Sequence, residues 1–185
     1  MAETEKLTEA AAEGNLDVRG DTESFHGAYG YIITGFNNTL NAIVEPLSVA
    51  GDYIRQVARG EELSQMDNAY KGVYGVLIDD LNEVGRSLNT LLSEAGQLTE
   101  AAAEGQLDYR ADLSKLQGGY AGIIGGVNKA LDALIDPLYV AAQYIEQIGR
   151  GEVPKPITEE YKGGFNDIKN SINSCIDGLG GLAEG

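Results

Sequence analysis

Leu7-Thr8-Glu9-Ala10-Ala11-Ala12-Glu13-Gly14 is the stretch that decides the fold, because it returns unchanged as Leu98-Thr99-Glu100-Ala101-Ala102-Ala103-Glu104-Gly105. The match between the two copies continues without a gap, and Arg19 falls onto Arg110. Repetition at a fixed spacing is the signature of an array of similar structural units. The chain is therefore built from two copies of one pattern, 91 residues apart.

A finer repeat of about 45 residues lies inside this pattern. A glycine closes each of four runs rich in alanine or isoleucine, and a second glycine follows 12 or 13 residues later. An aromatic residue and then an asparagine follow that second glycine at fixed spacings. The first glycines are Gly14, Gly60, Gly105 and Gly151; the aromatic residues are Tyr29, Tyr74, Tyr120 and Phe165; the asparagines are Asn37, Asn82, Asn128 and Asn173. This order predicts four units, at residues 1–45 (with a shortened first helix), 46–90, 91–136 and 137–185.

Apolar residues recur within the units at alternating steps of four and three. From Tyr29 this stripe passes through Ile33 and Phe36 and reaches Val57 without a break. Such spacing is the heptad pattern of a coiled-coil core and predicts a left-handed supercoil. We expect long helices near 26–59, 72–104, 118–150 and 163–180, and a short one before Gly14. Gly60 and Gly151 stand where a helix end favours a residue with positive φ.

The connectors between these helices hold about ten residues each, at 15–24, 61–69, 106–115 and 152–160. A tight antiparallel hairpin would need only two to five residues. Ten extended residues reach about 30 Å, which is further than a thirteen-residue helical segment of about 20 Å. Each connector can therefore return along its helix, so that the next helix lies parallel to it. Spaced apolar residues, such as Val153 and Ile157, are expected to anchor it in the groove.

The composition excludes several classes of function. The net charge of −16 argues against nucleic acid as a partner, because nucleic-acid binding needs a basic face. Cys175 is the only cysteine and His26 the only histidine, so neither an internal disulfide nor a Cys/His zinc site is expected. We find no motif of a catalytic nucleophile, a phosphate-binding loop or a metalloprotease. The sequence predicts no enzyme, no cofactor, no metal site, and no catalytic residue.

These features resemble the HAMP domain, the parallel two-helix signalling module of chemotaxis receptors, histidine kinases and adenylyl cyclases. Pro46-Leu47 to Arg59-Gly60 and Pro137-Leu138 to Arg150-Gly151 match its first helix. Gly151-Glu152-Val153 followed by Ile157 matches its connector, and the pairs Phe36-Asn37, Leu81-Asn82, Val127-Asn128 and Ile172-Asn173 match its second helix. The third unit departs from the pattern, because it opens with Leu91 instead of proline. The likeness is strongest to the tandem HAMP arrays of methyl-accepting chemotaxis proteins.

The resemblance implies an all-α fold of tandem parallel coiled-coil units. Each layer would be a four-helix bundle completed by homodimerisation. It also implies a non-enzymatic relay that passes conformational change between the input and output domains of a transducer, through bistable bundles. The implied partners are a second copy of the chain and the flanking domains of the parent receptor. The implied location is cytoplasmic, which includes the cytoplasmic part of a membrane-anchored receptor.

Each feature also has a purely structural interpretation. Pro46 and Pro137 are either markers of a unit boundary or hinges that tune coupling. The asparagines are packing or hydrogen-bonding positions instead of ligands, and Tyr29, Tyr74 and Tyr120 are aromatic residues of the first core layer. Two other functions stay open at this point: a passive helical spacer of the same fold, and a monomeric helical bundle that binds a partner in its core.

Overall fold

The computed structural model describes residues 2–67 and 69–183. Five α-helices and one 3-10 turn follow each other along the described residues, which contain no β-strand. They are α1 (Ala2–Ala12), α2 (Ala28–Arg59), α3 (Val73–Ala103), η1 (Leu113–Lys115), α4 (Gly118–Gly149) and α5 (Gly164–Ala183). The expected helices are confirmed to within a few residues at each end, whereas the turn η1 was not expected. Within the described residues, no helix is long and apolar enough to cross a membrane.

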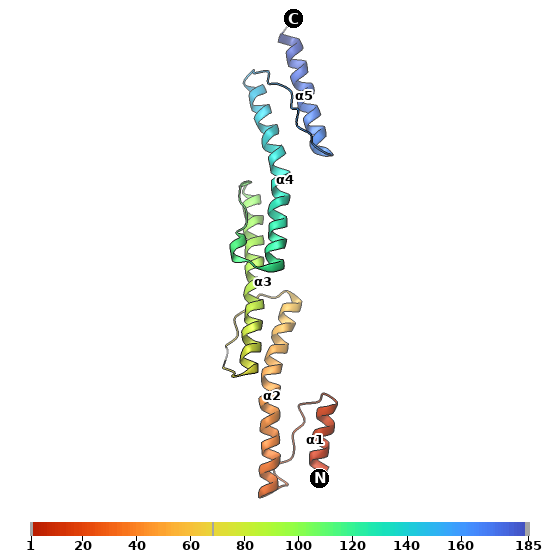
Figure 1. Cartoon of the computed structure of the whole chain (residues 1–185), viewed down its shortest axis with the longest axis vertical. Helices are drawn as coiled ribbons and strands as arrows, with labels where there is room; N and C mark the ends of the chain where they lie inside the picture. The colour runs from red at the N-terminus through yellow and green to blue at the C-terminus, as the bar shows by residue number, and fades with distance from the viewer. Residues whose placement is uncertain (1, 68, 184–185) are drawn as a thin grey trace. The chain divides into compact units, whose positions relative to one another are not determined.

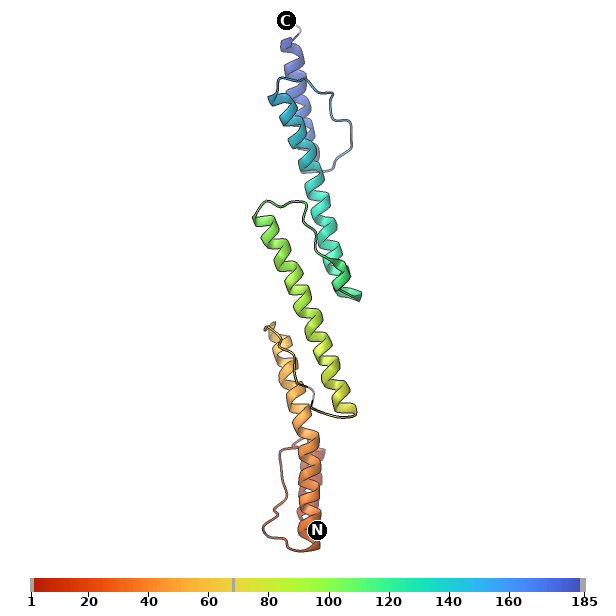
Figure 2. The ribbon, with the colours of Figure 1, turned by 90° about the vertical axis from the view of Figure 1, so that its left-hand side faces the viewer.

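The chain divides into two compact units, Met1–Thr90 and Leu91–Gly185. In the first unit, α1 and α2 run in the same direction, and the connector between them returns along the helices (Figure 1). In the second unit, the connector between α4 and α5 also returns before α5 begins, so that these helices run in the same direction (Figure 2). The boundary at Thr90–Leu91 coincides with the middle boundary of the four expected units. The division into four remains an interpretation.

Four helices end in the same hydrogen-bonded motif. At the end of α2, Gly60 adopts φ 66°, and its N–H donates to the carbonyl of Val57 at 3.0 Å. The next N–H, of Glu61, reaches back to the carbonyl of Gln56 at 3.1 Å. This Schellman motif satisfies carbonyls that a helix end would otherwise leave unpaired, and glycine adopts its positive φ without steric cost. The same pair of bonds occurs at Gly14, Gly105 and Gly151, so the prediction for Gly60 and Gly151 is confirmed.

The two prolines do not interrupt their helices. Pro46 lies inside α2 and Pro137 inside α4, and both helices continue for more than three turns beyond them. A proline inside a helix removes one backbone hydrogen bond, so packing must compensate for that loss. Pro46 is almost completely buried, which fits this requirement.

Each core cluster joins a helix, the connector that follows it and the next helix. In the second compact unit, one cluster combines Leu98 of α3 with Ala111 and Leu116 of the connector and Ile124 of α4. The other combines Ala141 of α4 with Ile157 of the connector and two residues of α5, Ile172 and Ile176. We call each such set of helix, connector and helix a junction, and number the four junctions in chain order by Asn37, Asn82, Asn128 and Asn173.

The second junction depends on a glycine. A Cβ atom at Gly85 of α3 would stand 1.8 Å from the hydroxyl oxygen of Tyr53 on α2. Tyr53 is buried, so its ring fills the space that any larger residue at position 85 would occupy. The helix tolerates the glycine, at a cost of about 1 kcal/mol relative to alanine, because the tyrosine packs in its place.

Candidate functional site

The four repeated asparagines make the same contact in all four junctions. Each side chain bonds both backbone groups of a single connector residue: its Oδ1 accepts from that residue's N–H, and its Nδ2 donates to the same residue's carbonyl. The two distances are 2.8 and 2.9 Å for Asn37 with Gly20, 2.8 and 3.0 Å for Asn82 with Met66, 3.1 and 3.0 Å for Asn128 with Ala111, and 2.8 and 3.1 Å for Asn173 with Ile157.

This two-point contact sets the register between connector and second helix. A carboxamide presents one acceptor and one donor side by side, which matches the N–H and C=O of one extended residue. The connector has no neighbouring strand to pair with, and a buried backbone group without a partner is costly. The asparagine therefore acts as a local substitute for a β-partner, and we call it the asparagine clamp.

An arginine adds a second attachment in the first and third junctions. Arg110 donates through Nη1 to the carbonyls of Leu107 and Tyr109, both at 2.7 Å. Its Nε donates to Oδ1 of Asp132 on α4 at 2.7 Å. Arg19 repeats this pattern with the carbonyls of Leu16 and Val18 and with Oδ1 of Asn41 on α2. The guanidinium thus ties the bend of the connector to the second helix.

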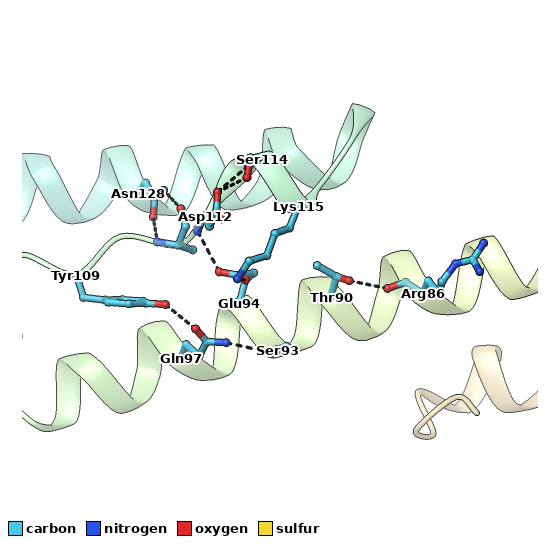
Figure 3. Close-up of polar contacts among 11 residues, drawn as sticks. Arg86, Thr90, Ser93, Glu94, Gln97, Tyr109, Asp112, Ser114, Lys115 and Asn128 are labelled. Atoms are coloured by element: carbon cyan, nitrogen blue, oxygen red, sulfur yellow. Dashed lines mark hydrogen bonds and ion pairs between the residues drawn. The ribbon is translucent and has the colours of Figure 1, made fainter. Parts of the chain in front are cut away.

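Glu94 is a charged residue in the interior of the third junction. It projects from α3 and is 1% exposed. One carboxylate oxygen accepts from the Asp112 N–H at 3.0 Å and the other from Lys115 Nζ at 2.7 Å, as Figure 3 shows. Asp112 in turn accepts hydrogen bonds from Ser114 within η1. Both oxygens of Glu94 are therefore used to hold the connector against the first helix.

The electrostatic balance around Glu94 favours its charged form. The hydrogen bond from Lys115 and then the backbone bond from Asp112 lower the pKa of Glu94, against a smaller opposing effect of burial. The same ion pair raises the pKa of Lys115. A buried carboxylate is stable only when it is paired and hydrogen-bonded, and this one is both.

The first junction contains a weaker form of the same contact. Glu3, which the 91-residue repeat aligns with Glu94, accepts from the Asp21 N–H at 3.1 Å. The corresponding residues on the first helices of the second and fourth junctions are Val49 and Val140, which carry no polar side chain. The sequence interpretation missed Glu94, although the pairing of Glu3 with Glu94 and of Asp21 with Asp112 in the repeat could have indicated it.

The other predicted residues lie at several kinds of position. Ile157 is buried in the core of the fourth junction, and Leu91 and Tyr120 pack against that of the third. Tyr74, Phe165 and Pro137 are half-buried. Gly60, Gly105 and Gly151 end their helices with positive φ.

Two of the predicted residues are exposed in the single chain. Val153 does not anchor its connector within one chain, because it is 50% exposed and lies outside the core cluster of Ile157. The neighbouring Pro154 is part-buried. Tyr29 is 74% exposed at the start of α2, so it packs in no core that a single chain forms by itself. Sequence spacing identified the apolar stripe but not which of its members pack within one chain.

The site is a set of mechanical attachments. In the described residues no three His, Cys, Asp or Glu side chains lie in a group that could hold a metal ion. The asparagine, arginine and glutamate side chains described above are engaged with connector backbone. The arrangement can transmit a displacement of one helix to the connector and to the next helix.

The asparagine clamp predicts a specific loss of stability for Asn82→Asp. Aspartate has nearly the same shape but cannot donate to the Met66 carbonyl, and it would place a charge at a position that is 4% exposed. We expect the free energy of unfolding to fall by about 1–3 kcal/mol, measured by denaturant titration. Asn38→Asp, one residue after the Asn37 clamp and exposed, is the control and should change little. Equal effects of the two variants would show that the clamp adds no stability.

Glu94 predicts a pH-dependent difference between the wild type and Glu94→Gln. Because the folded-state pKa of Glu94 lies below its ordinary value of 4.5, its contribution to stability is complete above that pH and is lost as pH falls through the lowered pKa. The stability gap between the two proteins should thus be largest near pH 7 and shrink below about pH 4.5, in urea titrations across pH. Glu100→Gln, an exposed change on the same helix, should give a small gap. A pH-independent gap for Glu94→Gln would contradict the ionic role.

A family model of the HAMP domain matches the chain twice, over residues 24–90 and 115–181. The two matches cover well over half of the chain. Each contains a long helix and a connector with its clamp, followed by the first half of α3 in one match and nearly all of α5 in the other. HAMP domains are non-catalytic signal-relay modules that sit between the input and output domains of transducers. On the repeated helix–connector–helix geometry and on both matches, the chain belongs to the HAMP domain family.

Proposed function

We propose that this chain is the relay segment of a chemotaxis-type transducer, in which tandem units pass a change of helix packing from an input domain to an output domain. The observation that carries the proposal is the sharing of single helices between junctions. The first half of α2 is clamped through Asn37 to one connector, and its second half packs through Tyr53 in the next junction. A rotation or shift of one half must therefore reach the other.

The second compact unit repeats this arrangement in α4. Asn128 and Asp132, before Pro137, hold the third connector. Ala141, after Pro137, packs in the fourth junction. In both compact units a continuous helix is the second helix of one junction and the first helix of the next. We propose that the predicted residues act here as relay positions: the clamps and glycines fix the connectors, and the stripe residues carry the packing change.

The exposed half of the heptad stripe supports assembly with a second copy of the chain. Before Pro46 and Pro137, alternate stripe residues such as Ile33 and Ile124 are buried, while most of those between them are exposed. After each proline the two heptad positions of the stripe exchange roles: the position that was buried before the proline is exposed after it, and the position that was exposed is buried. The exposed set comprises Tyr29, Phe36, Leu47, Ile54, Val127, Leu134, Leu138 and Ile145. An exposed apolar seam of this kind, one on α2 and one on α4, is typical of an interface. A parallel homodimer would close each layer into a four-helix bundle.

The homodimer predicts that one charge on the seam separates the copies. Leu134→Glu places a carboxylate where the partner would bury it, and burial of an unpaired charge is unfavourable. Sedimentation velocity should give a dimer for the wild type and a shift toward monomer for this variant. Ala133→Glu, next to it and exposed, should remain a dimer. A monomeric wild type at micromolar concentration would instead favour the monomeric binding-module interpretation.

The remaining alternative, a passive spacer, shares the fold and the dimer but lacks two states. We propose that each unit is bistable, with packing states a few kcal/mol apart. The 25 glycines, which weaken helices, support a core that can repack. Through the family likeness, the proposal also places the segment in the cytoplasm, next to its input and output domains.

Relay predicts sensitivity to helical phase. The segment is fused between a sensor domain and a kinase, and residues are inserted in α2 at Glu45–Pro46. Four inserted residues shift the phase of the stripe on one side of the insertion relative to the other, whereas seven keep it. We expect the four-residue insertion to abolish or invert the response of kinase activity to stimulus and the seven-residue insertion to retain most of it. Equal tolerance of both would reject phase-dependent relay and leave the spacer.

A further inference from the structure

One core position differs in charge between the fourth junction and the other three. Four residues after the first aromatic residue of each second helix stand Ile33, Ile78, Ile124 and Lys169. The three isoleucines are 4%, 0% and 2% exposed, which makes this position consistently buried in the first three junctions. Lys169 is half-buried. The fourth junction thus replaces a fully packed aliphatic residue with a cation.

Most residues around Lys169 are apolar, as they are around Ile124. A narrow crevice opens beside it, and its lining is mostly apolar: Val140, Ile157, Phe165, Ile168 and Ile172, together with Tyr161. Among the described contacts, its ammonium group meets the carbonyl oxygen of Glu159 at 3.5 Å. That distance is at the outer limit for a hydrogen bond. Two carboxylates, Glu159 and Asp136, lie near enough to the neighbouring Tyr161 to raise its pKa. Neither forms an ion pair with Lys169 among these contacts.

The physical consequence is a loosely packed layer. A lysine lays its methylene stem along apolar surface but keeps its ammonium group in water. It therefore does not supply the branched methyl groups that fill the space at Ile33, Ile78 and Ile124, and packing contacts are lost where a void remains. The buried residues of the fourth junction lie further along α5, at Ile172 and Ile176. Its first layer, beside Pro137 and Phe165, borders the crevice.

We propose that Lys169 is a built-in weak point, which makes the first layer of the fourth junction easier to repack than the equivalent layers of the other three junctions. This layer lies where the half of α4 after Pro137 meets the start of α5. Local opening at such a layer needs less free energy than at the closed layers of the other junctions. This consequence for signalling rests on the proposed function: in a relay, the fourth junction would be the first to change its packing when α4 moves.

Hydrogen exchange tests the weak layer without any assay of signalling. Amide protection is measured by mass spectrometry on the full chain, in peptides covering 164–172 and the equivalent 73–81. In the wild type, 164–172 should exchange faster than 73–81. In Lys169→Ile, protection of 164–172 should rise by about tenfold or more, because an isoleucine buried there gains the hydrophobic free energy that its counterparts have. Protection of 73–81 should stay the same.

Two further variants separate packing from general charge. Lys169→Met keeps the unbranched shape, removes the charge and should raise protection of 164–172. Lys162→Met removes an exposed charge from the preceding connector and should not. The proposal is overturned if Lys169→Ile leaves protection of 164–172 unchanged or lowers it, or if Lys162→Met raises it equally. The two proposals can fail separately. If Lys169→Ile raises protection of 164–172 but the four- and seven-residue insertions are tolerated equally, the proposed relay is rejected and the weak layer stands.

Discussion

The asparagine clamp is the contact on which the rest of the fold depends. A connector that returns along a helix has backbone groups but no neighbouring strand, and burying those groups without partners is costly. One carboxamide satisfies both groups of a connector residue in each of the four junctions. Because the connector is held in this way, the second helix can lie parallel to the first. That parallel order brings apolar residues of both helices and of the connector into one core.

The sharing of α2 and α4 follows from this local requirement. Each unit is too small to bury its apolar stripe alone, so its second helix continues as the first helix of the next unit. Pro46 and Pro137 stand where this change of role occurs, inside continuous helices. The exposed heptad position switches at the same place. Each proline can therefore both mark a unit boundary and tune coupling. The helix must adjust locally at this point, because the face that it packs changes there.

The sequence predicted most of the backbone. Helix ends follow from periodicity, and the caps at Gly60 and Gly151 follow from the positive φ that glycine supplies. The length of the connectors allowed parallel helices, and the resemblance to the HAMP domain implied them. Side-chain environments were harder to predict, because they depend on what faces a residue in space. Val153 has the expected anchor spacing but is 50% exposed. Glu94 is one of the many acidic residues of the chain, which were expected to face solvent, yet it is buried. Only the contacts from Lys115 and Asp112, 18 to 21 residues further along the chain, explain why a carboxylate is stable there.

A common backbone carries different side chains at the four junctions, and this separates geometry from stability. The clamps give each junction the same register. Glu94 with Lys115 adds a charged attachment in the third junction, Tyr53 against Gly85 adds a packed ring in the second, and Lys169 replaces a buried isoleucine in the fourth. When helices are joined in series, a displacement is divided among their junctions. The junction with the lowest free-energy cost of repacking then takes up most of it. Side-chain differences at equivalent positions can therefore determine where along the array a conformational change occurs, while the fold stays the same.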